Sequence, residues 1–221
     1  MKKKISPSVM CVDFFRLSEY INEFEKEGID MLHIDIMDGR FVPNYTLGTD
    51  FVRIIKEKTD IPLDIHLMVE EPENKLDWFP FGEGDSVSVH SESTRHLHKA
   101  ICAIRERGAK AFAAVNPATP VFMLGDAAPD ISGVLVMTVD PGFAGQKMTE
   151  GALIKIAKTR KWLDESGFSD KEIEVDGNVS FENARKMSLA GANIFVAGTS
   201  SLFKKGMKLK DALTQFKKAI G

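Results

Sequence analysis

Short runs rich in β-branched and apolar residues alternate along the whole chain with segments whose apolar residues recur at helical spacing. We expect strands at 4–9, 30–37, 62–68, 85–90, 110–115, 131–138, 172–176 and 193–197. Helices are expected between them, at 13–27, 50–58, 72–79, 93–107, 119–125, 149–166, 180–190 and 208–219. Such a regular alternation is typical of a parallel sheet in which a helix joins each strand to the next.

Residues 134–136 and 194–196 are apolar without alternation, as in strands that are covered on both faces of a parallel sheet. A doubly wound open sheet would share this pattern, but it usually has fewer strands. In addition, no glycine-rich dinucleotide turn follows the first expected strand. We therefore predict a (β/α)8 TIM barrel, an α/β fold in which residues 1–221 form a single domain with one large core.

Composition excludes several kinds of partner. The chain has 29 Lys and Arg residues against 32 Asp and Glu residues, mixed along its length, so its net charge of −3 gives no general attraction to nucleic acid or to an anionic membrane. No apolar stretch approaches a membrane span, and no secretory signal is recognisable. The two cysteines, Cys11 and Cys102, cannot form a disulfide framework. We expect a reduced, cytoplasmic protein.

Ionisable residues interrupt three expected strands near their carboxyl ends, where TIM barrels carry their chemistry. His33 and Asp35 share one face of the second strand, His66 lies near the end of the third, and Asp176 ends the seventh. A single histidine–aspartate pair at a strand end is commonly a structural hydrogen bond. Three converging strand ends favour a site, because buried ionisable groups are costly unless they are paired or bound to a metal. Two imidazoles and two carboxylates suit zinc, iron, cobalt or manganese.

Three methionines share the parity of these ionisable groups: Met37, Met68 and Met137. Methionine is more often core filler, but here the three would form an apolar wall beside the reacting centre. His90, at the end of the fourth strand, is interpreted as structural, and His96 and His98 as surface residues of a helix.

Glycine-bearing loops follow the last three expected strands. Residues 140–146 contain two glycines, Gly177-Asn178 follows the seventh strand, and Gly198-Thr199-Ser200 follows the eighth. The loops after the last two strands of a TIM barrel commonly hold phosphate through backbone N–H groups. We therefore expect a phosphate site at these loops.

The sequence resembles the ribulose-phosphate 3-epimerase family, including its allulose-6-phosphate 3-epimerase branch. The resemblance rests on motifs that stand in the family's order and span nearly the whole chain, at residues 5–8, 33–39, 41–44, 66–69, 136–146, 174–177 and 191–193.

This resemblance implies a metal-dependent ketose-phosphate 3-epimerase of carbohydrate metabolism, which interconverts D-ribulose 5-phosphate and D-xylulose 5-phosphate by two-base proton transfer at C3 through an enediolate. It implies one divalent ion (Zn, Fe, Mn, Co or Mg) held by His33, Asp35, His66 and Asp176. Asp35 and Asp176 would also be the catalytic acid and base. The phosphorylated ketose would be contacted by Ser8, His66, Gly142, Phe143, Ala144, Gly145, Asp176, Gly177, Asn178, Gly198 and Thr199. The resemblance further implies a homo-oligomer.

Some residues depart from the family pattern. Asn178 stands where the family commonly has a second glycine, and Thr199 stands where the pentulose enzymes usually have serine. With residues 8–11, these features lean toward the other branch, so epimerisation of D-allulose 6-phosphate to D-fructose 6-phosphate is an alternative. A metal-dependent aldolase and a non-catalytic sugar-phosphate sensor are further alternatives on the same fold. In an aldolase, the second, opposed carboxylate would lack a purpose.

Overall fold

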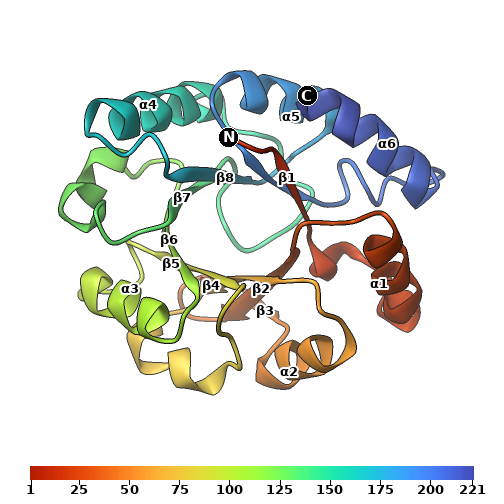
Figure 1. Ribbon diagram of the computed structural model, residues 1–221, viewed down its shortest axis with the longest axis horizontal. Coiled ribbons are helices and arrows are strands. Elements are labelled where there is room, and N and C mark those ends of the chain that lie inside the picture. The colour runs from red at the N-terminus through yellow and green to blue at the C-terminus, as the bar shows by residue number, and fades with distance from the viewer.

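The computed structural model describes residues 1–221. A sheet of nine strands curls into a ring, and helices surround it (Figure 1). All paired neighbours are parallel except β2 with β3, which confirms the predicted TIM-barrel class. The strands are β1 (Lys4–Pro7), β2 (Leu32–Asp38), β3 (Tyr45–Thr46), β4 (Leu63–Met68), β5 (Ser86–His90), β6 (Lys110–Val115), β7 (Gly133–Met137), β8 (Glu172–Asp176) and β9 (Ile194–Ala197).

The ring closes between β1 and β2. The hydrogen-bonded ladder runs β1-β9-β8-β7-β6-β5-β4-β2, and β1 meets β2 through a single parallel bridge between Ser8 and His33. The Ser8 hydroxyl also donates to Asp35 Oδ2 at 2.9 Å. Further inside the ring, the Ser6 hydroxyl of β1 donates to Asp64 Oδ2 of β4 at 2.8 Å. Side chains in the barrel interior therefore help to hold the closure.

Six α-helices flank the sheet, and several short 3-10 helices lie in the connections. No helix has both the length and the apolar character that crossing a membrane requires. The α-helices are α1 (Leu17–Lys26), α2 (Thr49–Lys58), α3 (Leu97–Glu106), α4 (Ala152–Glu165), α5 (Phe181–Leu189) and α6 (Leu209–Ile220). The 3-10 helices are η1 (Val9–Cys11), η2 (Phe14–Arg16), η3 (Pro72–Asn74), η4 (Leu76–Trp78) and η5 (Val121–Ala127).

The prediction of α-helices at 72–79 and 119–125 is wrong, because these regions form the 3-10 helices η3, η4 and η5. Phe79 is extended immediately before Pro80, as expected of a residue that precedes proline, so the first segment cannot continue as a helix. In the second, Gly125 lowers helix propensity within a segment of only a few residues.

The short strand β3 was not predicted, since two residues carry no periodic pattern. It pairs antiparallel with the end of β2, and the chain reverses at Gly39, whose φ is +72°. This positive φ lies in the left-handed region, so the hairpin requires glycine for its backbone angle.

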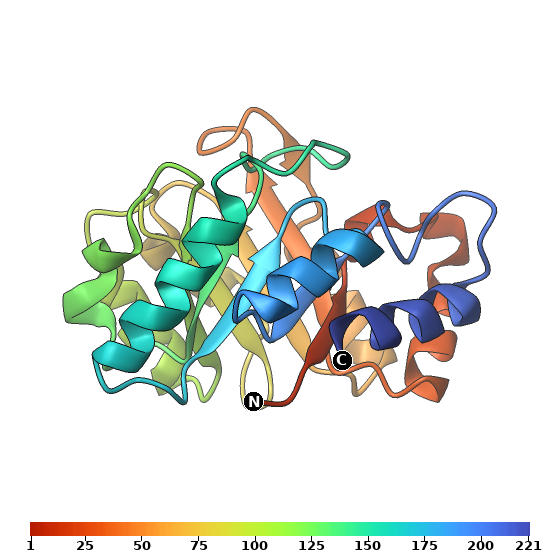
Figure 2. The ribbon, with the colours of Figure 1, turned by 90° about the horizontal axis from the view of Figure 1, so that it is seen from above.

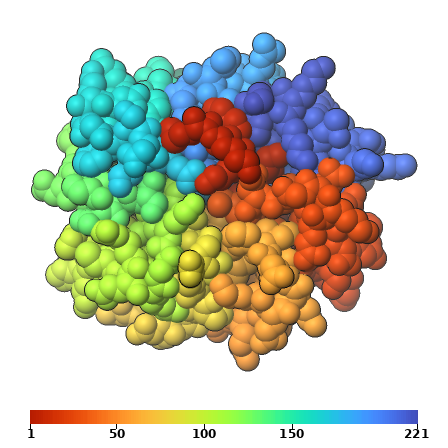
Figure 3. Space-filling model, viewed as in Figure 1, coloured from red at the N-terminus to blue at the C-terminus, as the bar shows by residue number.

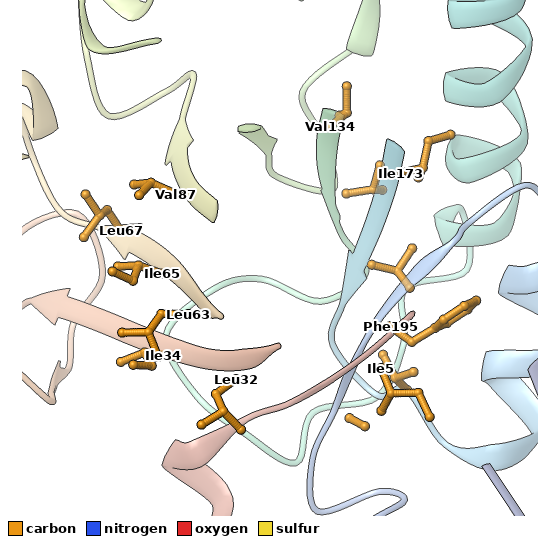
Figure 4. Packing of buried hydrophobic residues seen from close by; sticks show 14 of the residues in the cluster. Ile5, Leu32, Ile34, Leu63, Ile65, Leu67, Val87, Val134, Ile173 and Phe195 are labelled. Atoms are coloured by element: carbon orange, nitrogen blue, oxygen red, sulfur yellow. The ribbon is translucent and has the colours of Figure 1, made fainter. Parts of the chain in front are cut away.

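Alternate residues of the strands pack in opposite directions. Outward-facing side chains such as Ile34, Ile65 and Val134 belong to one cluster of 47 buried residues between the sheet and the helices, part of which is drawn in Figure 4. The barrel interior is mixed in character. β6 and β7 place apolar residues such as Phe112 and Leu135 there, whereas β1, β2, β4 and β8 contribute buried serine, histidine, aspartate and glutamate. The polar part of the interior is where a site can form.

The strands run toward the end of the barrel at which the segment after β2, orange, and the loop after β7, teal, rise above the ring (Figure 2). The N-terminus lies at the opposite end. On that opposite face the first residues sit in the middle, against segments that are distant in the sequence (Figure 3). The interior polar residues near the carboxyl ends of the strands therefore open toward the loops, as in other TIM barrels.

Close packing around Gly133 generates a stability prediction. Gly133 pairs with Phe112 of β6 and Glu172 of β8, and a Cβ would lie 2.4 Å from Phe112 Cε1 and 2.5 Å from the Glu172 carbonyl oxygen. We expect Gly133→Ala to lower the free energy of unfolding by about 1–3 kcal/mol, the usual cost of overpacking, as measured by urea denaturation.

The matched control is Gly125→Ala, because a Cβ at Gly125 would meet no atom within 4 Å. This variant should keep the wild-type unfolding free energy or exceed it slightly, since alanine restricts the unfolded chain. Equal stabilities of the two variants would contradict the packing argument.

Candidate active site

Four ionisable side chains meet near the carboxyl end of the barrel interior. His33 and Asp35 come from β2, His66 from β4 and Asp176 from β8, and one ligating atom of each lies within 4.8 Å of the other three. His33 Nε2 and His66 Nδ1 lie 3.2 and 3.3 Å from Asp35 Oδ1. The same two nitrogens lie 4.0 and 3.7 Å from Asp176 Oδ2. The fold thus brings together the four residues that the sequence indicated.

Two different features of the fold produce this meeting. Asp35 and His66 are direct partners in the parallel ladder between β2 and β4, so their side chains share one face at the same height. Asp176 arrives from the other side of the ring, since β9 and β1 stand between β8 and β2 in the closed order. The two aspartates therefore face a common point from separate directions.

This donor set fits a divalent cation. The side chains of His33 and His66 are fully buried and that of Asp35 is 5% exposed. Asp176 is 17% exposed, and because two carboxylates lie this close together with little access to solvent, they need positive charge nearby. Imidazole nitrogen and carboxylate oxygen are ligands that zinc, iron, cobalt and manganese accept.

The two aspartates differ in their affinity for a proton. Burial alone would raise the pKa of Asp35, but His33 and His66 outweigh burial and hold this pKa well below its usual range. Burial and the neighbouring Asp35 charge raise the pKa of Asp176 to about 6, against partial opposition from the same histidines. The site therefore contains one strongly acidic carboxyl group and one that holds a proton more tightly.

Each histidine of the cluster has a second polar neighbour, which sequence reasoning missed. His33 Nδ1 lies 2.7 Å from Asp64 Oδ2, and His66 Nε2 lies 2.8 Å from His90 Nε2. His90, interpreted from the sequence as structural, thus contacts a residue of the cluster. The available signal was parity, because Asp64 stands two residues before His66 on the same strand and therefore shares its face.

A cavity opens above the cluster, toward the loops. The histidines lie beneath its floor, while Asp35 and Asp176 reach its surface together with Ser8 and the three methionines predicted as a wall. The loops predicted to hold phosphate form its rim, including Gly142, Phe143, Ala144, Gly145, Gly177, Asn178, Gly198 and Thr199.

The turn after β8 has a conformation suited to anion binding. Gly177 has a φ of +111°, and a Cβ there would lie 2.6 Å from Val139 Cγ2, so only glycine fits. Asn178 follows in the left-handed region with a φ of +48°. The backbone N–H groups of Gly177, Asn178, Gly198 and Ser200 donate no hydrogen bond within the protein. These donors lie at the cavity rim, where they can contact an anionic group without any side-chain charge.

The loop after β7 is tied to both sides of the cavity. Asn44 Nδ2 donates to the Gly142 carbonyl oxygen at 2.8 Å, and Asn178 Nδ2 donates to the Gln146 carbonyl oxygen at 2.6 Å. Asn178 therefore links the turn after β8 to this loop.

The other residues singled out in the sequence lie as follows. Cys11 lines the cavity, and burial raises the pKa of its thiol, which disfavours the reactive thiolate. His96 and His98 are exposed at α3, as predicted. Cys11 and Cys102 are both free thiols, in agreement with the absence of a disulfide framework.

Solved structures resemble the whole chain in fold. Orotidine 5'-phosphate decarboxylase from Pyrococcus horikoshii OT3 aligns with a TM-score of 0.64 at 17% identity, covering 98% of this chain and 99% of that one. 3-Hexulose-6-phosphate synthase from Salmonella typhimurium aligns with a TM-score of 0.65 at 17% identity, covering 98% of each chain. At these identities the likeness concerns the fold alone.

Sequence comparison is more specific. Ribulose-phosphate 3-epimerase of Bacillus subtilis (strain 168) is 45% identical over 197 residues, which cover 89% of this chain and 91% of that protein. The enzyme of the same name from Synechocystis sp. is 43% identical over 198 residues, covering 89% of this chain and 86% of that protein. The model of the ribulose-phosphate 3 epimerase family matches residues 4–203. The chain therefore belongs to the ribulose-phosphate 3-epimerase family and is an isomerase.

Proposed function

We propose that this chain, as one domain over residues 1–221, is a metal-dependent ketose-phosphate 3-epimerase that interconverts D-ribulose 5-phosphate and D-xylulose 5-phosphate. The observation that carries the proposal is the pair Asp35 and Asp176, which face one point from separate sides of the ring and differ in pKa. The relatives at 45% and 43% identity, both named ribulose-phosphate 3-epimerase, support the pentulose substrate.

Inversion at C3 requires that a proton leaves one face of the carbon and that another arrives on the opposite face. One fixed base cannot reach both faces of a bound substrate. Asp35, whose low pKa keeps it ionised, removes the C3 proton, and the electron pair moves into the adjacent carbonyl group to form an enediolate. Asp176, whose pKa is raised, donates a proton to the opposite face. In the reverse direction the two residues exchange roles.

The residues that would hold the divalent ion are His33 and Asp35 from β2, His66 from β4 and Asp176 from β8. When bound, the ion supplies positive charge that stabilises the negative charge developing on the substrate oxygens. Ser8 contributes separately, because its hydroxyl donates to Asp35 Oδ2 and so leaves the other carboxylate oxygen directed at the cluster. Asp35 is thereby held in one orientation.

The phosphate group of the substrate would be bound at the rim by the unpaired N–H groups of Gly177, Asn178, Gly198 and Ser200. The phosphate is at the other end of the substrate from the reacting carbon. Its binding energy therefore serves to position C3 between the two carboxylates. The three methionines that line the cavity offer an apolar surface to the sugar chain and limit the access of water.

Epimerisation in deuterium oxide tests the reaction directly. Since the proposal includes a proton that leaves C3 and another that is returned, D-xylulose 5-phosphate formed from D-ribulose 5-phosphate should carry deuterium at C3, as measured by NMR. A triose product would indicate an aldolase, and the absence of both exchange and product, after metal addition, would indicate a sugar-phosphate sensor.

A kinetic comparison of two substrates separates the two epimerase branches. We expect kcat/KM for D-ribulose 5-phosphate to exceed that for D-allulose 6-phosphate when both are measured on one metal-reconstituted preparation. The opposite order would assign the chain to the hexulose branch, toward which Asn178 and Thr199 lean.

Replacement of Asp176 tests the two-base scheme. Asp176→Asn preserves the shape of the side chain but removes its acid–base capacity, so we expect kcat to fall by about 10²–10⁴-fold, while calorimetry detects substrate binding. The control is Asp170→Asn, at an exposed aspartate outside the cavity, which should behave as wild type. Wild-type turnover in Asp176→Asn would refute the scheme.

Metal affinity should depend on pH. A ligand must lose its proton before it binds a metal. Asp176 has a pKa of about 6, and although burial lowers the pKa of His33, Asp35 and Asp64 raise it well above its usual value. Raising the pH removes both protons, so affinity should increase with pH, up to about pH 6 for the Asp176 proton and to higher pH for the His33 proton, by about tenfold per pH unit for each proton released.

Titration of the metal-free protein with Co²⁺ at a series of pH values measures this dependence. Asp176→Asn should lose the part of the slope below about pH 6, because its amide has no proton to release. An affinity that does not change with pH would show that these groups are not the ligands.

A further inference from the structure

The two ring nitrogens of His33 face different groups. Nε2 points to the metal-ligand cluster, 3.2 Å from Asp35 Oδ1, whereas Nδ1 points away from it and lies 2.7 Å from Asp64 Oδ2. The side chains of His33 and Asp64 are both fully buried, so this contact is shielded from solvent. Asp64 therefore contacts the histidine from below the cluster and is outside the cavity.

Side chains from two other strands reach the His33–Asp64 pair. The Ser6 hydroxyl of β1 donates to Asp64 Oδ2 at 2.8 Å. Glu174 of β8 is also fully buried, and its Oε1 lies 3.5 Å from His33 Nδ1. Rotation of the His33 ring would break its contact with Asp64 and leave buried polar atoms without partners, which is costly. The contact with Asp64, on the side of His33 that faces away from the cluster, therefore fixes the orientation of the His33 ring.

The chemistry of a carboxylate decides which nitrogen carries the proton. An ionised carboxylate can only accept hydrogen bonds, so Nδ1 of His33 must be the donor toward Asp64. With the proton on Nδ1, the Nε2 lone pair is free to face the cluster. The same Asp64 oxygen accepts from the Ser6 hydroxyl, so it faces both neighbours as an acceptor.

His66 is arranged differently. Its Nδ1 faces the cluster and its Nε2 lies 2.8 Å from His90 Nε2, so it presents the opposite nitrogen and is backed by an imidazole. An imidazole can be donor or acceptor, and it does not by itself impose one tautomer. Asp64 is thus the carboxylate whose contact dictates the tautomer of a cluster histidine.

We propose that Asp64 is a positioning residue of the metal centre, which holds His33 with Nδ1 protonated and Nε2 directed at the ion. The inference rests on the proposed function, since it requires a divalent ion at the four-residue cluster. Outer carboxylates of this kind typically change metal affinity by about 10–100-fold when removed.

The variant Asp64→Asn tests this role. Its amide has nearly the same shape, but it lacks the charge and can turn its NH₂ group toward Nδ1, which would favour the other tautomer. We expect its affinity for Zn²⁺, measured by competition with a chelator on metal-free protein, to be about 10–100-fold weaker than that of the wild type.

Asp85→Asn is the matched control. Asp85 is another buried aspartate, and its carboxylate accepts from the backbone N–H groups of Leu63 and Gly82, remote from the cluster. This variant should lose stability through the same kind of charge removal yet keep wild-type affinity for Zn²⁺. Equal affinity losses in both variants would indicate a general structural effect and overturn the proposal.

A spectroscopic measurement on the wild type requires no variant to fold. The chain has five histidines, so ¹⁵N NMR of the zinc-loaded protein can resolve the ring nitrogens of each. We expect His33 to show a protonated Nδ1 and a zinc-bound Nε2. A protonated Nε2 would overturn the proposal. If the wild type bound no zinc, the metal centre of the proposed function would fail and this inference with it. Wild-type zinc affinity in Asp64→Asn would instead overturn the inference alone.

Discussion

Two carboxylates held close together with little access to solvent repel each other, and this repulsion is the constraint on which the rest of the site depends. Asp35 and Asp176 approach the same point, so one must hold a proton or positive charge must be supplied. The two histidines lie closer to Asp35 than to Asp176. Burial acts on both carboxyl groups and the Asp35 charge acts on Asp176, and together with this asymmetry they make the two pKa values unequal. The difference in pKa turns two chemically identical side chains into one group suited to take a proton and another suited to give one.

The same interior residues connect the site to the closure of the barrel. β1 meets β2 through one backbone bridge, and the hydroxyls of Ser8 and Ser6 reach Asp35 and Asp64. Elsewhere the ring is held by continuous parallel ladders and an apolar layer against the helices. At this closure between β1 and β2, polar side chains replace regular backbone pairing, and any change that loosens it also moves Asp35, the proposed base. Under the proposed function, stability and catalysis are coupled there more closely than at β6 or β7, whose interior residues are apolar.

Family membership agrees with this geometry without replacing it. The match over residues 4–203 covers the strands and the loops that carry the cluster and the cavity rim. Asn178, at the turn after β8, combines a backbone conformation typical of glycine with a side-chain hydrogen bond. It keeps a left-handed backbone, as a glycine would, and uses its side chain to tie the loop after β7. The rim is thereby braced in a way that a glycine cannot provide, next to the N–H groups proposed to hold phosphate.

Much of the fold and of the cluster could be predicted from the sequence, because both follow from local periodicity. Alternation with a period of two assigns His33, Asp35 and His66 to interior faces, and the order of strands and helices leads to a barrel with Asp176 at the same end. The tertiary structure alone decided that Asp64 backs His33 and that His90 backs His66. It also decided that Asp35 and Asp176 differ in pKa. The reason is physical: these properties depend on distances across the ring between strands far apart in the chain, and on burial, neither of which a local pattern contains.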